Sequence, residues 1–358
     1  MNNEKRERAI DHKCPNCGAK IVFVPELGKW KCDNCKGEFD LETLKKYNNA
    51  SSEENNKDIE TEVDTNYVEY HCKNCGAKII ADENTASTFC VYCGNTAILK
   101  SKLSGKFAPS KIIPFKKSKD EALEAFKNLS KGKPLMPKFF NKKENIEKLS
   151  GVYIPFWLYS VSAEGNIDVS ATKVATWTSG DTSYTKTDTY DVTREGKMKY
   201  DRIPVDGSTR FADDLMNTIE PFNYNEMVDY NHAYLSGFLA EKYDVESEKG
   251  EAVAKQRAEE TTKNTFLASV TGYSSTIIKN SNINETIDNV EYVLLPVWMV
   301  NVKYKDQYYT FAMNAQTGEF VGDIPISKER AIAFGIGIFL VVALIVLLIC
   351  FIVYKGGM

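Results

Sequence analysis

The sequence VYIPFWLYSV, residues 152–161, predicts a buried strand, because the run is continuous, apolar and rich in aromatic and β-branched side chains. Its proline, Pro155, lies near the entry of the strand, where a missing backbone N–H is tolerated. A second run, VLLPVWMVNV at 293–302, carries a proline and a tryptophan at the positions of Pro155 and Trp157. The pair indicates either a duplicated half-domain that closes a common core, or two strands that are similar by coincidence.

Strand patterns continue beyond both runs. From 165 to 205, Thr, Tyr and Val alternate with polar residues around the turn signals SGD and EGK, which predicts an antiparallel meander with one face in water. The second run continues as a strand, a turn at AQTG and another strand. Between the runs, residues 231–245 and 247–266 read as helices, and the second should be exposed because it is polar on nearly all sides. We therefore expect an α+β domain with an antiparallel sheet over residues 150–326.

Eight of the nine cysteines form four C-x-x-C pairs, and the last two pairs repeat the spacing of the first two. CPNCGAKIV begins at Cys14 and CKNCGAKII at Cys72, and the interval between the two pairs is the same in both copies. Two thiolates on a tight turn grip one side of a tetrahedral zinc ion, and the intervening hairpin brings a second turn to the other side. The predicted ligands are Cys14, Cys17, Cys32 and Cys35 in the first copy and Cys72, Cys75, Cys90 and Cys93 in the second.

This spacing predicts two zinc ribbons, at residues 11–43 and 67–100, each with one structural Zn²⁺ that four thiolates close to water and substrate. Gly18 and Gly37 follow the two turns of the first ribbon and should tolerate positive φ there. Three other uses of the cysteines compete with zinc. A redox dithiol normally has one C-x-x-C at a helix start, disulfides do not suit a reducing compartment, and an iron or iron–sulfur centre fits the symmetric spacing less well than zinc.

Two charged segments connect these parts. Residues 44–66 are acidic and poor in aromatics, which is typical of a flexible linker. Residues 101–149 are rich in lysine: from Lys100 to Lys148, fourteen lysines and five acidic residues give a net charge of +9. This segment is either a solvated face or a surface for an anionic partner or membrane headgroups. Within it, Ser118 and Glu121 form a capping box that predicts the start of an amphipathic helix.

The C-terminal run from Ala331 to Tyr354 contains no charged residue. A helix of that length is about 36 Å long, which is enough to cross a bilayer. Lys328 and Arg330 precede the run, which favours a cytoplasmic N-terminal side, and cysteines suited to metal indicate a reducing compartment. We expect a tail-anchored, single-pass protein of the cell membrane with its bulk in the cytoplasm.

Catalytic motifs are missing from the sequence. It contains no phosphate-binding loop, dinucleotide fingerprint, H-E-x-x-H or G-x-S-x-G. His232 is the histidine of the large domain, and its setting favours packing or surface exposure over a general base. The net charge of −4 argues against a general nucleic-acid binder. We therefore expect neither an enzyme nor a small-molecule substrate.

The order of parts is distinctive. It runs from two ribbons of the types CPNCGAK…CDNCKG and CKNCGAK…CVYCG, through a domain with IPFW and LPVWMVNVKYKDQYYTFAMNAQTGEFVGDIP, to a single terminal span. Over essentially the whole chain this order resembles the bacterial TFIIB-type zinc-ribbon-containing membrane proteins, which are often labelled as similar to the replication-restart helicase PriA. A helicase motor needs a phosphate-cradling loop and a metal-binding carboxylate, and this sequence offers neither. The resemblance implies an accessory role at the membrane with phage-shock-type envelope-stress proteins.

Two functions follow as expectations. The first is a non-catalytic adaptor that recruits a cytoplasmic protein partner to the membrane. The second, less favoured, is a tethered nucleic-acid-binding module that uses the lysine-rich segment and ribbon aromatics such as Trp30 and Tyr92. An enzyme would additionally need a pocket of polar groups in the large domain.

Overall fold

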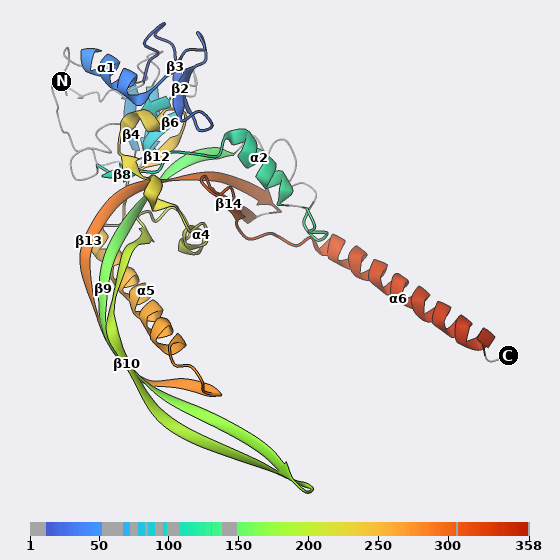
Figure 1. Ribbon diagram of the computed structural model, residues 1–358. Helices are drawn as coiled ribbons and strands as arrows, with labels where there is room; N and C mark the ends of the chain where they lie inside the picture. Colours follow the sequence, from blue (N-terminus) through green and yellow to red (C-terminus); the bar gives the residue numbers. More distant parts are fainter. Residues whose placement is uncertain are drawn as a thin grey trace.

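A computed structural model describes residues 12–51, 67–71, 78–82, 85–89, 96–98, 108–129, 131–137, 149–305 and 307–356. The chain has a mixed α+β fold with antiparallel sheets and one long apolar helix near its C-terminus, as the sequence predicts. Figure 1 shows the N-terminal strands at one end of a long curved sheet, and the apolar helix α6 leaving from that end.

The helices are α1 (Leu41–Ser51), α2 (Lys119–Asn128), α4 (Asp213–Thr218), α5 (Ser247–Ala268) and α6 (Lys328–Gly356), with 3-10 turns η4 (Tyr224–Glu226) and η5 (His232–Leu235). The N-terminal strands are β1 (Ile21–Val24), β2 (Lys29–Cys32), β3 (Glu38–Phe39), β4 (Tyr67–His71), β5 (Lys78–Asp82), β6 (Thr85–Phe89) and β7 (Thr96–Ile98). The remaining strands are β8 (Lys111–Ile112), β9 (Ser150–Ser179), β10 (Thr182–Asp206), β11 (Val228–Asp229), β12 (Leu239–Glu241), β13 (Ser275–Tyr304), β14 (Gln307–Asn314) and β15 (Phe320–Val321).

The two similar apolar runs lie side by side at the centre of the sheet. The first run begins β9 and the second ends β13, and the two strands pair antiparallel, with Ile154 opposite Leu295 and Tyr153 opposite Pro296. Side chains of both runs are buried on both faces of the sheet. The buried pair of strands therefore forms the core, as the continuous apolar pattern predicts.

The elements around these strands follow the same order twice. A short strand, a helix, a long strand and its hairpin partner occur as β8–α2–β9–β10 and as β12–α5–β13–β14, and each short strand pairs parallel with the other half's long strand. Trp157 donates its indole N–H to the Val245 carbonyl at 2.8 Å, and Trp298 donates to the Lys117 carbonyl at 2.8 Å. Val245 follows the first residue of β12, Leu239, by as many residues as Lys117 follows the first residue of β8, Lys111. The same arrangement therefore occurs twice around the core.

Beyond the core, β9, β10 and β13 continue as a long curved arm (Figure 1). Helix α5 covers one face of the arm, and its buried residues are Gly250, Ala254, Ala258 and Thr262. The predicted exposure of this helix therefore holds for its outer faces, and one stripe of small side chains packs closely against the arm. A Cβ on Gly250 would lie 2.3 Å from the Tyr159 hydroxyl, so only glycine fits.

The expected meander is a single long hairpin. The turn at SGD is confirmed, with Gly180 at a φ of 61°. The expected turn at EGK was wrong, because Gly196 lies inside β10, opposite Gly165 of β9. Glycine is needed at position 165 because β9 and β13 approach closely: a Cβ on Gly165 would lie 2.0 Å from the Asn282 carbonyl oxygen. Register shifts along β10 and β13 add bends to the arm.

Residues 231–245 are not the predicted helix. They form the short turn η5 and then strand β12, which pairs parallel with β9 and antiparallel with β6. The Asn231 side chain accepts the Ala233 N–H and starts the turn, and Gly237, at a φ of 96°, breaks any further helix. The short run of apolar residues around Leu239 then completes the sheet rather than a helix face.

One helix start agrees with the sequence, and another helix was not predicted. The capping box of α2 is confirmed, with reciprocal hydrogen bonds between Ser118 and Glu121. Helix α1 extends into the segment expected to be a linker, because Asp40 caps it and Leu44 is buried. Residues 52–66, the rest of that segment, lie outside the described residues. Strands β6, β7 and β8 join the large sheet, which therefore extends N-terminal of residue 150.

Candidate metal centre

Four cysteine sulfurs gather beside the three-stranded sheet β1–β2–β3, which lies in the segment predicted to be the first ribbon. Cys14 Sγ lies 3.5 Å from Cys35 Sγ, and Cys17 Sγ lies 3.6 Å from Cys32 Sγ. All four sulfurs lie within 4.8 Å of one another. A tetrahedral zinc ion with bonds of about 2.3 Å requires sulfurs about 3.8 Å apart. The cluster therefore fits a single four-coordinate metal ion.

The two cysteine turns share one backbone geometry. The Cys14 N–H donates to the Ala19 carbonyl at 2.8 Å, and the Cys32 N–H donates to the Gly37 carbonyl at 3.0 Å. These two turns face each other because β1 and β2 pair antiparallel in the hairpin between them. Strand β1 begins at Ile21, a few residues after the first turn, and leads into this hairpin.

One detail of the turns differs from the prediction. The Gly18 N–H donates to the Cys14 carbonyl at 2.9 Å, and the Lys36 N–H donates to the Cys32 carbonyl at 3.0 Å. The positive φ values fall on these two donors, 71° for Gly18 and 59° for Lys36. Gly37 was predicted to take this conformation, but the position directly after the second cysteine needs it in both turns.

The four thiols have unlike surroundings. Cys14 and Cys32 are buried, whereas Cys17 and Cys35 are exposed. Burial raises the pKa of Cys14 to about 12, while a hydrogen bond from the backbone of Ala19 lowers the pKa of Cys17 to about 6. A divalent cation held by all four sulfurs would favour the thiolate form of each. With every ligand position taken by sulfur, the centre would hold the ribbon together and leave no site for substrate.

The first ribbon packs on the large domain through an aromatic cluster. Trp30 is 1% exposed and donates its indole N–H to the Ala233 carbonyl at 2.8 Å. Its ring lies 5.0 Å from that of Phe23 and 5.1 Å from that of Tyr234. The Phe23 N–H also donates to the Ser236 carbonyl at 3.0 Å. Trp30 is therefore buried in this contact and presents no ring for stacking on a nucleic-acid base.

The second predicted set of ligands, Cys72, Cys75, Cys90 and Cys93, lies outside the described residues. Strands on either side of these cysteines are described. His71 pairs with Lys78, which is the same register as the bridge between Lys13 and Lys20 at the corresponding positions of the first ribbon. Strand β6 binds the segment that also holds the first ribbon, because the Ser87 hydroxyl donates to the Phe238 carbonyl at 2.9 Å.

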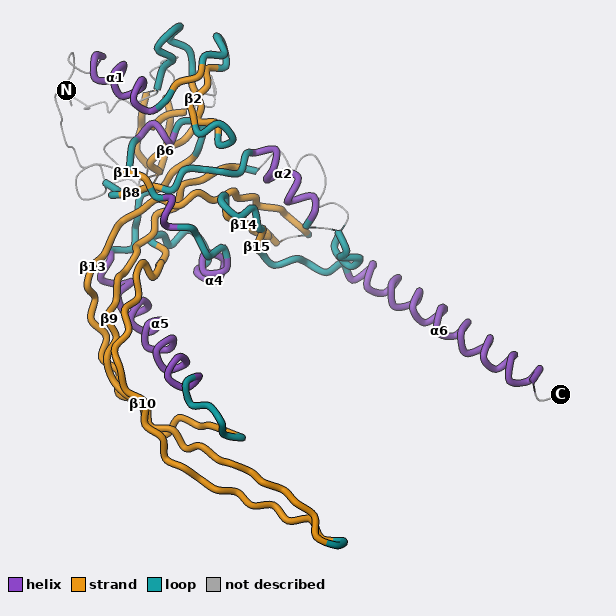
Figure 2. The backbone as a smooth tube through the Cα atoms, viewed as in Figure 1, coloured by secondary structure: helices purple, strands orange, loops and turns teal. Residues whose placement is uncertain are grey.

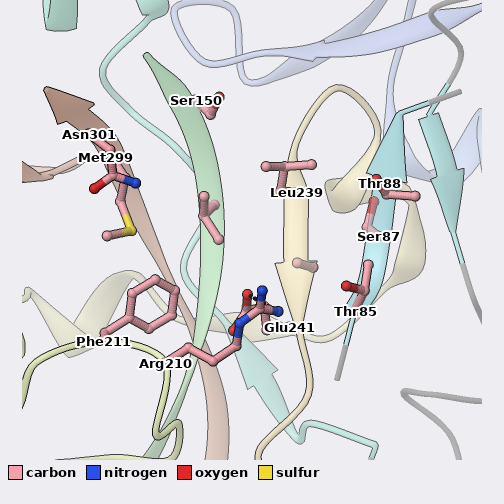
Figure 3. A pocket seen from close by; sticks show the side chains of 12 residues that line it. Thr85, Ser87, Thr88, Ser150, Arg210, Phe211, Leu239, Glu241, Met299 and Asn301 are labelled. Carbon is pink, nitrogen blue, oxygen red and sulfur yellow. Dashed lines mark ion pairs between the residues drawn. The ribbon is translucent and has the colours of Figure 1, made fainter. Parts of the chain in front are cut away.

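A pocket of about 410 Å³ opens where β6, β12, β9 and β13 meet (Figure 3). The Arg210 guanidinium lies 2.9 Å from the Glu241 carboxylate at its rim, and Val152 and Met299 form part of its apolar wall. The described residues that line the pocket include no histidine or cysteine. Its polar groups are the hydroxyls of Ser87 and Ser150 and the Arg210–Glu241 ion pair, among others.

Two buried acids had no signal in the sequence. Burial raises the pKa of Asp206 to about 7, and burial also raises the pKa of Glu220 to about 7. Arg257 lies 3.7 Å from Glu220 and partly offsets this effect. Neither acid lines the pocket, and His232 does not line it either. The burial of these two acids makes the stability of the domain depend on pH.

The C-terminal helix is long and apolar enough to cross a membrane over Lys328–Ile352, judged by length and composition. Its apolar side chains are exposed on all sides, including Phe339, Leu344 and Leu347. A helix that packed in a soluble core would bury such side chains. Cys350 is one of these exposed positions.

Comparisons with known proteins place the chain in a family. No model of a known protein family matches it, and no solved structure matches it. The chain is 37% identical over 329 residues to a Bacillus subtilis (strain 168) protein described as "Uncharacterized protein YdjG", a match that covers 92% of this chain and 94% of that protein. This description names neither a zinc ribbon nor a PriA-like helicase. The chain belongs to the family of the Bacillus subtilis protein YdjG.

Proposed function

We propose that this protein is a non-catalytic, membrane-anchored adaptor that recruits a cytoplasmic partner to the cell membrane. Helix α6 crosses the membrane once, and the bulk of the chain lies on the cytoplasmic side. Both ribbons hold one structural Zn²⁺ each, with Cys14, Cys17, Cys32 and Cys35 as ligands in the first. The partner is a protein of a phage-shock-type envelope-stress response, as the resemblance of the whole chain to zinc-ribbon membrane proteins implies.

The observation that carries this proposal is the free end of the arm. Strand β13 begins at Ser275, which pairs with Thr172 of β9. Beyond Thr172, β9 and β10 continue as a two-stranded hairpin. At its tip, Trp177 is 50% exposed and Tyr184 is 46% exposed, and their rings stack with centroids 5.7 Å apart. Large exposed aromatics with few rotatable bonds are typical anchors of protein interfaces.

The aromatic pair belongs to a longer surface on the α5 side of the arm. Tyr190 lies opposite Ala171, and both share the face of Trp177 by the alternation of side chains along a strand. The Lys173 ammonium lies 5.7 Å from the ring centre of Tyr190 and 5.3 Å from that of Tyr273. Helix α5 ends before this part of the arm (Figure 2). The surface that carries Trp177, Tyr184 and Tyr190 therefore suits a partner that packs on the same side of the arm as α5, beyond the end of that helix.

The ribbons have a supporting role in this proposal. Both bind the segment from Ala233 to Ala240, which also supplies strand β12 to the sheet. A closed four-sulfur site contributes folding free energy but no open coordination position. Loss of zinc should therefore disturb the packing around β12 and leave the membrane span unaffected.

A nucleic-acid role is less well supported. Trp30 is buried against Ala233, and Tyr92 lies outside the described residues. Four thiolates around one divalent cation would also leave each ribbon with a local charge of about −2, which repels phosphate. This function nevertheless remains a distinct outcome of the experiment below.

The test is affinity purification of the full chain from crosslinked native membranes. Wild type is compared with a double variant, Trp177→Ala and Tyr184→Ala. The matched control replaces Thr176 and Thr185, which share a 3.4 Å hydroxyl contact on the opposite face of the same hairpin, with alanine. We expect one defined protein to copurify with wild type and control and to be lost from the aromatic variant.

Two results would overturn the adaptor proposal. Copurification of DNA or RNA that nuclease removes, in place of a protein, would make the tethered nucleic-acid module the better account. An identical set of copurified proteins from all three chains would show that the arm tip binds none of them.

A further inference from the structure

Two loops that together carry basic and aromatic side chains contact the start of α6. We infer that these loops, residues 131–137 and the β13–β14 turn at Tyr304 and Lys305, form a collar that binds anionic phospholipid headgroups of the membrane that α6 enters. This inference rests on the proposed membrane span. It adds a lipid class to the proposed function and a defined orientation of the domain at the membrane.

The first loop is bound to the helix start by backbone contacts. The Ser327 N–H donates to the Leu135 carbonyl at 2.9 Å, and the Arg330 guanidinium donates to the Met136 carbonyl. Met136 is buried. Lys131 and Lys133 are exposed on the same loop, within a few residues of these contacts. These two lysines therefore lie on the loop whose residues Leu135 and Met136 contact the start of α6.

The second loop reaches the same point from the sheet. The Lys305 ammonium lies 3.3 Å from the Glu329 carboxylate and 5.2 Å from the ring centre of Tyr304. The rings of Tyr304 and Tyr309 lie 6.4 Å apart. Tyrosine is enriched at membrane–water interfaces, because its ring is apolar and its hydroxyl is polar. This loop thus combines a basic and an aromatic side chain at the helix start.

The helix itself completes the collar. The Ser327 hydroxyl accepts the Arg330 N–H at 3.3 Å and caps the first turn, and the charge-free run begins at Ala331. Just before the cap, Ile326 is 62% exposed, which suits an interfacial position better than water. The basic residues of the collar are Lys131, Lys133, Lys305, Lys328 and Arg330. Its acidic residues are Glu329, which pairs with Lys305, and Asp306 in the sequence of the β13–β14 turn, so basic residues outnumber acidic ones.

A lipid surface is the ligand that this geometry selects. Basic side chains within a turn or two of a membrane span lie inside the negative potential of an anionic leaflet, whatever else is in solution. At about 1 kcal/mol for each Lys or Arg, one such residue changes the ratio of bound to free loop about fivefold. Lys131 and Lys133 together should therefore contribute a factor of about 25.

The consequence concerns orientation. A single span fixes only the place of a domain at the membrane, because the chain can pivot at the helix start. Two loops that bind headgroups beside the span, and that contact different residues of its first turn, remove that freedom. The collar would then hold the arm at one angle to the membrane and present its tip to the partner.

The experiment uses the full chain in nanodiscs of phosphatidylcholine alone or with about a third phosphatidylglycerol. Hydrogen–deuterium exchange of the amides in 131–137 is measured in both. We expect this exchange to slow by at least about fivefold in the anionic discs and to recover at high salt, where surface charges are screened. Replacing Lys131 and Lys133 with glutamine should abolish the difference.

A second pair of lysines provides the matched control. Lys197 and Lys199 are exposed on the arm, far along β10 from the collar, and their replacement with glutamine should leave the lipid effect unchanged. Equal exchange in both disc types at low salt would overturn the inference, and so would slowing by inorganic phosphate in neutral discs. A chain that enters neither disc would instead refute the membrane span on which the proposed function depends.

Discussion

Replacing Trp30 with phenylalanine should loosen the first ribbon from the large domain. The substitution removes the 2.8 Å hydrogen bond to the Ala233 carbonyl and leaves that oxygen without this donor in a buried contact. Leaving a buried polar group unpaired costs about 1 to 3 kcal/mol. The phenyl ring retains part of the packing against Phe23 and Tyr234, so we take about 2 kcal/mol as the net loss. This loss would raise the population of the undocked ribbon about 30-fold.

Metal release is a sensitive assay for that change. The purified full chain, loaded with zinc, is mixed with an excess of a coloured chelator, and the rate of zinc transfer is recorded. If release from the first site requires an undocked ribbon, Trp30→Phe should accelerate one of the two phases by about the same 30-fold. Trp177→Phe, at the exposed arm tip, is the control and should leave both phases unchanged.

An unchanged release rate alone could mean that docking does not limit metal loss. Hydrogen exchange of the amides in 233–238 therefore accompanies it. If Trp30→Phe alters neither zinc release nor the protection of this segment, the docked arrangement of the first ribbon is refuted.

Three further predictions concern the large domain. Gly165→Ala should lower the free energy of unfolding by about 1 to 3 kcal/mol, measured by chemical denaturation, because its Cβ would meet the Asn282 carbonyl at 2.0 Å; an unchanged midpoint would contradict the strand packing. Trp157→Phe and Trp298→Phe should each cost about 1 to 3 kcal/mol, since both indoles make the same 2.8 Å bond, and a large difference in thermal midpoint would contradict their equivalence. Burial raises the pKa of Asp206 to about 7, so its contribution to stability is full below about pH 4 and is lost as the pH rises through 7. Asp206→Asn should therefore stabilise the domain by on the order of 2 to 4 kcal/mol at pH 8 and little at pH 4, and equal effects at both pH values in calorimetry would contradict a buried carboxyl.

Local patterns predicted much of the fold. The two apolar runs, the capping box at Ser118 and the charge-free run from Ala331 each depend on neighbours in sequence, and each forms the expected element. The first four cysteines come together because a hairpin of fixed length joins their turns. Such features need no knowledge of distant contacts.

Features that depend on distant contacts could not be predicted. Residues 231–245 have a helical apolar pattern, but part of their backbone pairs with β6 and β9 as a strand, and Trp30 bonds to the Ala233 carbonyl. Gly196 reads as a turn signal, although its position is set by Gly165 on the opposite strand. The sequence of α5 is polar on nearly all sides and predicts an exposed helix. Its stripe of small buried residues packs against an arm that is distant in sequence, so the sequence gives no sign of that contact. From the sequence, Trp30 is expected to be a surface on which a nucleic-acid base could stack. Its burial depends on the contact with Ala233, which is distant in sequence.

The most direct test of the central claim, that the cysteine cluster is a closed structural metal site in a binding protein, is X-ray absorption spectroscopy of the purified full chain at the zinc edge. The account predicts four sulfur ligands at about 2.3 Å and no light-atom ligand. Cys14→Ser with Cys17→Ser should remove one ion while the chain still enters membranes. An oxygen or nitrogen ligand in place of a sulfur, or a wild-type chain that holds no zinc, would contradict the account.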